Sequence, residues 1–441
     1  KDRQDDYDEV LKISTKLFEE NKTSENLIDL VRILVKLKLF CEIDKYQDLD
    51  IFNTDVKIEC ANAFYYNGEI ERAKKLLTQC NQDDERVLLL KGKIKFDDKN
   101  LDEADIIFNK IGKNSQNPEV LNFLGLFDLE KMDFIEAIKN FSKAVNIDGS
   151  NSKYFYNLAN AYFYNGWLEE AQKAYTKALY LNPDNLDYRY SLAYLYFDKK
   201  DFGKAKKEID AILDIDANHS QACVLKALLL AENKDFLGAK SLLEQNLKKG
   251  FTDDFTKISL SKIYSELNIF DKAEELINDV IKNNPENLNY LSDMADIYLK
   301  EKNYDKALEI ANKIININPN YISGYIIGAK TAYSQEKFEL AKDYAQNAIS
   351  LDINCSEGYY YLALVREKLN DIDEAVECMK RAILYDLNNP KYYAKMSDFY
   401  KNKGDYKTAL EYVSEAETLD NSNEYKFMYS ELVKLNRKIK N

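Results

Sequence analysis

Small residues recur in this chain at a fixed spacing. From position 137 onward an alanine stands at every 34th residue until near the end of the chain: Ala137, Ala171, Ala205, Ala239, Ala273, Ala307, Ala341, Ala375 and Ala409. Ala73 and Ala104 precede this series at slightly shorter spacing. Another small residue stands twelve positions before each of these alanines: Ala61, Gly92, Gly125, Ala159, Ala193, Ala227, Ser261, Ala295, Ala329, Ala363 and Ser397. A spacing kept this strictly predicts one structural unit repeated about eleven times.

Residues 152–185 show what the repeated unit is. The first half of this block carries apolar residues at the spacing of one helix face: Phe155, Leu158, Ala159 and Tyr162. Asn165 and Gly166 end that pattern, and a second helical stripe runs from Ala171 to the stop at Pro183. The unit is therefore two helices joined by a short turn. Methyl groups at Ala159 and Ala171 let the helices approach closely, because larger side chains there would overpack the contact and cost roughly 1–3 kcal/mol.

This block resembles the tetratricopeptide repeat (TPR) nearly position for position, and the resemblance covers about residues 54–423. It implies an all-α fold, a right-handed superhelical solenoid of antiparallel helix pairs with a 34-residue period. It does not name a function, because such repeats serve many unrelated complexes.

Three segments are expected along the chain. Residues 1–53 are N-terminal helices that form either a degenerate repeat or a cap, and Ser24 is predicted to be an N-cap residue within them. Residues 54–423 are the eleven repeats. Residues 424–441 are predicted to form an amphipathic C-terminal helix that covers the apolar face of the last repeat.

The charge of the chain bears on its partners. The formal net charge is −14 and the isoelectric point is near 4.9. Nucleic-acid backbones need a basic surface, so nucleic-acid binding is not expected. A protein or peptide partner that is neutral to basic fits the charge better. No stretch approaches the roughly 18 apolar residues of a membrane span, so no membrane insertion of this segment is expected.

The cysteines indicate a reducing compartment. The chain has six, with no CxxC pair: Cys41, Cys60, Cys80, Cys223, Cys355 and Cys378. Cys60, Cys80 and Cys223 occupy repeat positions that normally hold buried residues, so they are predicted to be reduced core residues. The expected location is the cytoplasm. The chain begins at Lys1 without an initiator methionine, which leaves open a removed N-terminal signal or anchor.

Catalytic chemistry is not expected. His219 is the one histidine of the chain, and its position between two repeats suggests a polar residue at a helix end. Histidine-dependent triads and HExxH zinc sites are therefore excluded. No glycine-rich phosphate loop is present. The sequence predicts a protein that is not an enzyme, with no metal site and no cofactor.

The resemblance points instead to a binding surface. In TPR folds the first helix of each pair lines the inner, concave wall. Carried over to two successive blocks, the inner positions are Lys153, Tyr156, Asn157, Asn160, Phe163, Tyr164, Asp187, Tyr190, Ser191, Tyr194, Phe197 and Asp198. Seven of them are the predicted peptide-binding residues: Tyr156, Asn157, Asn160, Phe163, Tyr190, Tyr194 and Phe197. Tyrosine suits recognition because it offers a large contact area with a polar tip. The alternative is that these aromatic residues only pack between helices.

Three functions are compatible with the sequence. The first is a non-catalytic scaffold that binds an extended peptide or partner helix in a concave groove. The second is the targeting arm of a larger enzyme, for example a glycosyltransferase, whose catalytic domain lies outside this chain. The third is a scaffold that self-associates through its ends or its convex face, because stacked repeats can continue from one molecule to the next.

Overall fold

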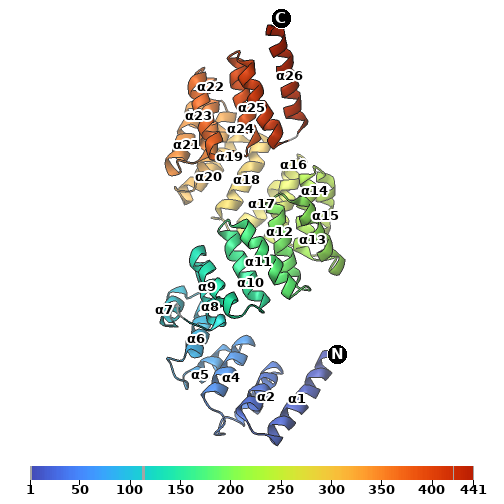
Figure 1. Ribbon diagram of the computed structural model, residues 1–441, viewed down its shortest axis with the longest axis vertical. Coiled ribbons are helices and arrows are strands. Elements are labelled where there is room, and N and C mark those ends of the chain that lie inside the picture. Colours follow the sequence, from blue (N-terminus) through green and yellow to red (C-terminus); the bar gives the residue numbers. More distant parts are fainter. Residues whose placement is uncertain (1, 112–114, 421, 441) are drawn as a thin grey trace. The chain divides into compact units, whose positions relative to one another are not determined.

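The computed structural model describes residues 2–111, 115–420 and 422–440, with side chains for 9–111, 115–420 and 422–437. Every regular element in these ranges is an α-helix (Figure 1), as the repeat predicts. By internal packing the chain forms two compact units, residues 1–208 and residues 209–441, which we call unit 1 and unit 2.

Most of the helices form pairs. The first helices of the pairs are α4 (Thr54–Tyr66), α6 (Glu85–Asp97), α8 (Pro118–Glu130), α10 (Ser152–Tyr164), α12 (Leu186–Asp198), α14 (Ser220–Glu232), α16 (Asp254–Glu266), α18 (Leu288–Glu301), α20 (Ile322–Ser334), α22 (Ser356–Lys368) and α24 (Pro390–Asn402). The second helices are α5 (Ile70–Leu77), α7 (Leu101–Ile111), α9 (Phe134–Ile147), α11 (Leu168–Leu181), α13 (Phe202–Ile215), α15 (Phe236–Lys248), α17 (Phe270–Asn283), α19 (Tyr304–Ile317), α21 (Phe338–Leu351), α23 (Ile372–Tyr385) and α25 (Tyr406–Leu419). The division into cap, repeats and final helix remains a prediction.

The recurring small residues lie in the contact between paired helices. The alanines that recur along the chain, from Ala73 to Ala409, are all fully buried, and so are Ser261 and Ser397. Ser397 on α24 also donates a hydrogen bond across the pair to the carbonyl oxygen of Ala409 on α25, at 2.8 Å. Glycine takes this position in two pairs, where the facing residue is a phenylalanine. A Cβ on Gly92 would come within 2.3 Å of the Phe108 ring, so only glycine fits there.

The turn inside each pair repeats its backbone conformation as strictly as the alanines repeat. One residue per turn has a positive φ, and from position 132 onward these residues are 34 apart: Met132, Gly166, Lys200, Lys234, Asn268, Lys302, Glu336, Asn370 and Gly404. This left-handed residue reverses the chain just after the first helix ends. Glycine adopts the conformation without strain, yet most of these turns use a side chain-bearing residue.

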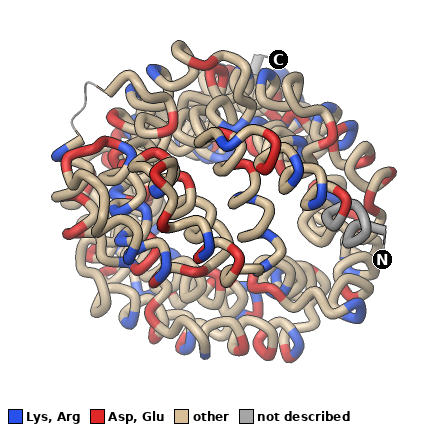
Figure 2. Tube along the Cα trace, turned by 90° about the horizontal axis from the view of Figure 1, so that it is seen from below, with Lys and Arg blue, Asp and Glu red and all other residues tan. Residues whose placement is uncertain are grey.

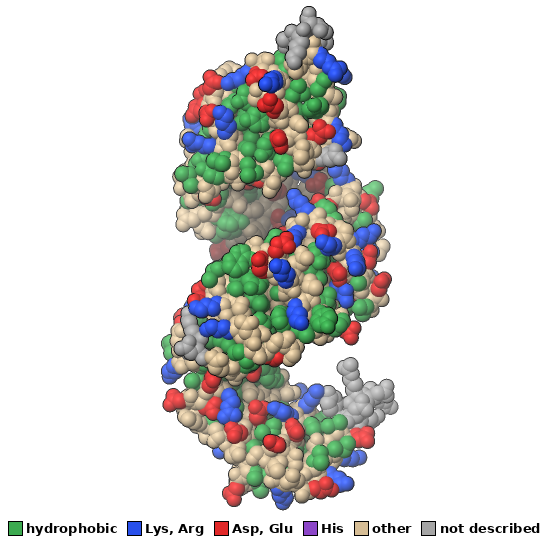
Figure 3. Space-filling model, in the orientation of Figure 1, with side chains coloured by type: hydrophobic (Ala, Val, Ile, Leu, Met, Phe, Trp, Pro, Cys, Tyr) green, Lys and Arg blue, Asp and Glu red, His purple; other side chains and the backbone are tan. Residues whose placement is uncertain are grey.

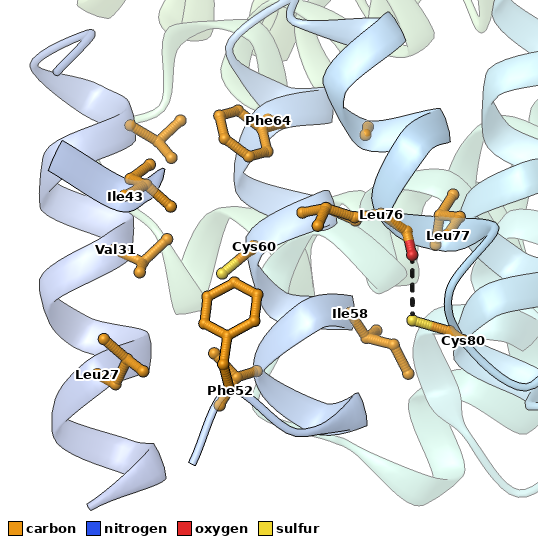
Figure 4. Close-up of a cluster of buried hydrophobic side chains, with 14 of the residues drawn as sticks. Leu27, Val31, Ile43, Phe52, Ile58, Cys60, Phe64, Leu76, Leu77 and Cys80 are labelled. Atoms are coloured by element: carbon orange, nitrogen blue, oxygen red, sulfur yellow. Dashed lines mark hydrogen bonds between the residues drawn. The ribbon is translucent and has the colours of Figure 1, made fainter. Parts of the chain in front are cut away.

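The N-terminal helices share one core with the first pair. They are α1 (Asp2–Glu20), α2 (Ser24–Lys36) and the short α3 (Phe40–Asp44). Figure 4 shows side chains of α2, α3, α4 and α5 packed in one cluster, and Phe18 of α1 belongs to the same cluster. Lys38, between α2 and α3, has the same left-handed conformation as the repeat turns.

The predicted cap of α2 is wrong by one residue. Thr23, not Ser24, is the N-cap, and its hydroxyl accepts a hydrogen bond from the backbone N–H of Asn26 at 3.2 Å. The Ser24 hydroxyl donates instead to the carbonyl oxygen of Ile51, at 3.4 Å. Both residue types can cap a helix, so the local sequence alone does not distinguish them.

At the other end of the chain, α26 (Asn423–Lys440) packs on the last pair. Its Tyr425 is buried with residues of α24 and α25, and its Leu432 is buried with Ala409 and Val413 of α25. The opposite face of α26 presents Phe427 to solvent.

Smaller features agree with the sequence. The cysteines predicted to be buried are buried: Cys60, Cys80 and Cys223. His219 is the N-cap of α14, where its Nδ1 accepts a hydrogen bond from the backbone N–H of Ala222 at 3.3 Å. Among the described residues, no helix is both long and apolar enough to cross a bilayer. Lys and Arg are interspersed with Asp and Glu along the trace (Figure 2), and the face drawn in Figure 3 mixes charged and apolar side chains.

Candidate functional site

A pocket lined mostly by aromatic rings lies on the first helices α10 and α12 of unit 1. Its volume is about 340 Å³, and we call it the aromatic pocket. The lining residues are Tyr156, Asn160, Phe163 and Tyr164 of α10, Tyr175 of α11, and Tyr190, Ser191 and Tyr194 of α12.

The repeat register brings these residues together. Tyr156 and Tyr190 occupy equivalent positions in successive repeats, and so do Asn160 and Tyr194. Both helices begin at an asparagine N-cap one residue before the helix, Asn151 for α10 and Asn185 for α12. Equivalent starts and equal lengths place the same helix face of each repeat on the same wall, so side chains of neighbouring first helices meet.

The inner part of the aromatic pocket is fixed by hydrogen bonds and stacking. The buried Tyr175 hydroxyl donates to Asn160 Oδ1 at 2.5 Å. Burial raises the pKa of Tyr175, so the hydroxyl stays protonated and keeps donating. The ring of Tyr156 stacks on Tyr188 with centroids 4.7 Å apart, and its hydroxyl lies 3.3 Å from Ser191 Oγ. The hydroxyl groups of Tyr175 and Tyr156 therefore already have hydrogen-bond partners inside the protein.

The mouth of the pocket is formed by more exposed rings. Phe163 lies edge-on to Tyr164 and to Tyr194, with centroid distances of 5.8 Å and 5.9 Å and an interplanar angle of 69° in both pairs. Tyr194 also lies 6.4 Å from Tyr190. Tyr164 is 62% exposed and Tyr194 is 36% exposed. Burial raises the pKa of Tyr194, and the carboxylate of Asp198 raises it further.

Five of the seven predicted residues line the pocket: Tyr156, Asn160, Phe163, Tyr190 and Tyr194. The other two do not. Asn157 is buried, and its Nδ2 donates to Asn122 Oδ1 of α8 at 2.8 Å. The ring of Phe197 lies against that of Phe202, with centroids 5.7 Å apart. The two residues therefore join helices to one another.

The sequence reasoning missed Tyr175, because it considered inner positions on first helices alone. Tyr175 lies on the apolar stripe of a second helix, four residues after Ala171, and reaches the pocket between α10 and α12. Its place on that stripe, opposite the small Ala159, was the available signal.

A second pocket was also missed. It lies on α16, α18 and α20 of unit 2, has a volume of about 620 Å³, and we call it the charged pocket. Cross-helix ion pairs line it: Lys262 with Asp293 at 2.8 Å, Lys330 with Asp296 at 3.0 Å, and Lys300 with Glu266. Lys262, Asp296 and Lys330 are 34 residues apart, a pattern of alternating sign that the sequence already contains.

The cation and carboxylate groups of the charged pocket neutralise one another. Asp293 is the most enclosed of its carboxylates, with 22% of its side chain exposed. Burial raises the pKa of Asp293 from its ordinary value despite the neighbouring Lys262. In the part of the chain that the structure describes, no group of three or more His, Cys, Asp or Glu side chains is arranged to hold a metal ion.

Comparison with known proteins identifies the repeat. The family model of the Psidin N-terminal TPR repeats region matches residues 188–419, and the tetratricopeptide repeat model matches residues 152–185. The chain belongs to this family of tetratricopeptide repeat proteins. TPR repeats generally mediate protein–protein interactions, and TPR folds are generally non-catalytic. A search of curated proteins gives no match.

Solved TPR structures resemble this one. The APC/C hetero-tetramer Cut9–Hcn1 aligns over 98% of this chain and 94% of its own, with 12% identity and a TM-score of 0.51. A tetratricopeptide repeat protein from Parabacteroides merdae aligns over 57% of this chain and 99% of its own, with 20% identity and a TM-score of 0.47. A thermophilic TPR protein in Thermus thermophilus aligns over 41% and 99%, with 19% identity and a TM-score of 0.38. At these identities the likeness to Cut9–Hcn1 supports the fold alone.

Proposed function

We propose that this TPR protein is a non-catalytic scaffold that binds an extended peptide or a partner helix in a concave groove formed by first helices. The aromatic pocket on α10 and α12 is the observation that carries this proposal. It is open to solvent, and six of its eight lining residues are aromatic.

Aromatic side chains in such a setting favour binding. Tyrosine is enriched among residues that dominate interface energetics, and it has few rotors to immobilise on binding. Tyr156 is already held by Tyr188 and Ser191. A partner that enters the pocket therefore meets a wall that is largely ordered beforehand, which reduces the entropic cost of association.

A pull-down from a native extract tests the proposal. The test variant combines Tyr156→Ala, Tyr190→Ala and Tyr194→Ala, and the control variant changes three exposed aromatic residues elsewhere, Tyr180, Phe427 and Tyr429, to Ala. We expect the test variant to lose partners that the parent and the control variant retain. Circular dichroism and thermal unfolding of each variant check that the helices remain intact.

Loss of Tyr156 also removes a stacking contact inside unit 1. A milder variant, Tyr164→Ala with Tyr194→Ala, changes only the mouth of the pocket. If both folded variants recover the same partners as the parent, the aromatic pocket is not the binding site.

The net charge of −14 supports a partner that is neutral to basic. Long-range attraction between opposite charges accelerates association and weakens as salt screens it. We expect the association rate with such a partner to fall as ionic strength rises. An association rate that is independent of salt, or rises with it, contradicts this part of the proposal.

Self-association is a second candidate function, and α1 supports it. Val10, Ile13 and Leu17 lie at helical spacing on α1 and are all exposed. An apolar face of this kind can be covered by a second copy of the chain. Light scattering over a concentration series, on the parent and on an Ile13→Asp, Leu17→Asp variant, tests this. One monomer mass for the parent at every concentration rules it out.

The remaining alternative, a targeting arm of a larger enzyme, stays a prediction. The coding sequence that flanks this chain decides it. A catalytic domain next to the repeats supports the alternative, and start and stop codons directly at the two ends remove it. The cytoplasmic location and the lack of nucleic-acid binding also stay predictions.

A further inference from the structure

We propose that the aromatic pocket is a cage for a cationic side chain, a lysine or arginine of the partner, which it holds by cation–π attraction. This inference rests on the proposed function for the identity of the partner as a peptide or protein, and it adds the chemistry of the anchor residue. The observation behind the proposal is that the rings of α10 and α12 are inclined to one another around a pocket that has no charged lining residue.

The ring geometry suits a cation. Tyr164 and Tyr194 are each inclined by 69° to Phe163, so the three rings form walls that face different directions instead of one flat stack. The edge-to-face pairs are in direct contact, so the place for a cation is over the ring faces that border the pocket, where the negative quadrupole of each ring attracts it. Tyr156 and Tyr175, inclined by 54° to each other, add two further rings to the pocket lining.

The polar groups of the pocket do not compete for this role. Asn160 Oδ1 accepts from Tyr175, and the hydroxyls of Ser191 and Tyr156 are within hydrogen-bonding distance of each other. None of the eight lining residues carries a charge. Asp198 lies one turn beyond Tyr194 on α12, and its carboxylate raises the pKa of the Tyr194 hydroxyl. The surroundings therefore favour a positive group over a negative one.

Lysine side chains approach tyrosine rings elsewhere in the molecule. Lys306 Nζ lies 4.8 Å from the ring centroid of Tyr298, and Lys177 Nζ lies 5.1 Å from that of Tyr180. In the described part of the chain, no Lys or Arg lies over the rings of Tyr156, Phe163, Tyr164 or Tyr194. Tyr156 stacks on Tyr188 and Tyr164 on Phe134, so a cation from the partner would use the remaining faces of these rings.

A purely apolar anchor is the competing occupant, and two ligands of equal shape distinguish them. Choline carries a quaternary ammonium group, and 3,3-dimethylbutan-1-ol is its neutral isostere. We expect choline to bind the full chain roughly tenfold more tightly than the alcohol, measured by saturation-transfer NMR titration. Equal affinities, tighter binding of the alcohol, or no binding of either compound overturns the cage.

Variants of one ring locate the effect. Tyr194→Phe keeps the ring and should keep choline binding within about twofold of the parent. Tyr194→Leu keeps an apolar side chain without a π face and should weaken choline binding severalfold while leaving the alcohol unaffected. Tyr180→Leu, remote from the pocket on α11, is the matched control and should change neither. Loss of choline binding in the control and not in Tyr194→Leu would place the site elsewhere and also overturn the cage.

The outcomes separate this inference from the proposed function. Partner loss in the tyrosine triple variant together with equal binding of choline and its isostere leaves the scaffold standing and removes the cage. Choline binding that depends on Tyr194, together with unchanged partner recovery, leaves the cage standing and removes the scaffold role of this pocket.

Discussion

Gly125 on α8 lies so close to Phe141 on α9 that a Cβ on the glycine would come within 2.7 Å of the phenylalanine ring. Gly92 lies comparably close to the ring of Phe108 in the preceding pair. In the next pair an alanine, Ala159, stands at the equivalent position, opposite Tyr175. In the two glycine pairs the phenylalanine ring fills the space that a Cβ would need, whereas the third pair leaves room for the methyl group of Ala159, and close-packed interiors feel a change of one methylene.

Gly125→Ala should destabilise unit 1 by roughly 1–3 kcal/mol, because the added methyl overlaps a fully buried ring. Phe141→Leu in the same chain should restore part of the loss, so the two changes should be non-additive. Urea unfolding followed by circular dichroism measures each variant. Gly203→Ala is the control, since the nearest atom to its Cβ would be 4.0 Å away, and it should stabilise α13 by about 0.5–1 kcal/mol. Additive effects at Gly125 and Phe141 contradict the shared-volume explanation.

The left-handed turn residues allow a paired test. A Cβ on Gly166 would meet nothing within 4 Å, so Gly166→Ala should cost about 1 kcal/mol through backbone strain alone. Met132 has the same conformation with a side chain that is mostly exposed, and Met132→Gly should raise stability by a few tenths of a kcal/mol up to about 1 kcal/mol. Thermal unfolding of both variants checks the opposite signs. Two shifts of the same sign would mean that the backbone conformation does not control stability here.

Asp293 predicts a pH dependence in unit 2. Burial raises its pKa, so the folded protein binds this proton more tightly than the unfolded chain does. The contribution of Asp293 to the free energy of unfolding is therefore greatest at low pH and is lost as pH rises through the raised pKa. Asparagine does not titrate. We expect the stability of Asp293→Asn relative to the parent to increase from about pH 4 to about pH 7.

Denaturant unfolding at both pH values measures this difference. Asp279→Asn is a control of opposite sign, because its ion pair with Lys257, at 2.5 Å, lowers the pKa of an exposed carboxylate. Its relative stability should fall, or stay level, over the same interval. A relative stability of Asp293→Asn that falls with rising pH would show that Lys262 outweighs burial at this carboxyl.

The cysteines should differ sharply in reactivity. Burial raises the pKa of the Cys60 thiol to about 12, so its thiolate fraction near pH 8 is on the order of 10⁻⁴. Cys41 is exposed. Iodoacetamide should therefore modify Cys41 within minutes and leave Cys60 intact in the folded protein, as peptide mass spectrometry would measure. Alkylation in denaturant is the control and should label both. Equal labelling of the two in the native protein would contradict the burial of Cys60.

Much of the fold follows from the sequence because the 34-residue period acts through side-chain size. Ala159 and Ala171 predicted a close helix contact, and both are fully buried. The pattern could not predict which of two capping residues begins α2, because the Ser24 hydroxyl bonds to Ile51 and Asn53, contacts that the local sequence does not reveal.

Only the pocket residues that lie on first helices could be predicted, because the prediction used the register of equivalent positions in those helices. That register placed Tyr156, Tyr190 and Tyr194 on one wall, and they line one pocket. The register does not predict the hydrogen bond from Asn157 to Asn122, because the helical period alone does not fix which residues at the border of a face point to the groove and which point to the neighbouring helix. The charged pocket does not follow from the pattern of small and apolar residues, because that pattern does not say how lysines and carboxylates on neighbouring helices pair. Their alternation at Lys262 and Asp296 marks ion pairs between neighbouring helices.

The turn conformation that recurs from Met132 to Gly404 accepts lysine, asparagine, glutamate, methionine or glycine alike. A gene segment encoding 34 residues can thus be duplicated or deleted anywhere in this series without any turn having to be re-evolved, since the backbone closes in the same way at every joint. Each duplication would add one more stretch of recognition wall, and the shorter spacings before Ala137 show that the links between pairs also accept fewer residues. Growth by whole units is the change that this architecture tolerates best.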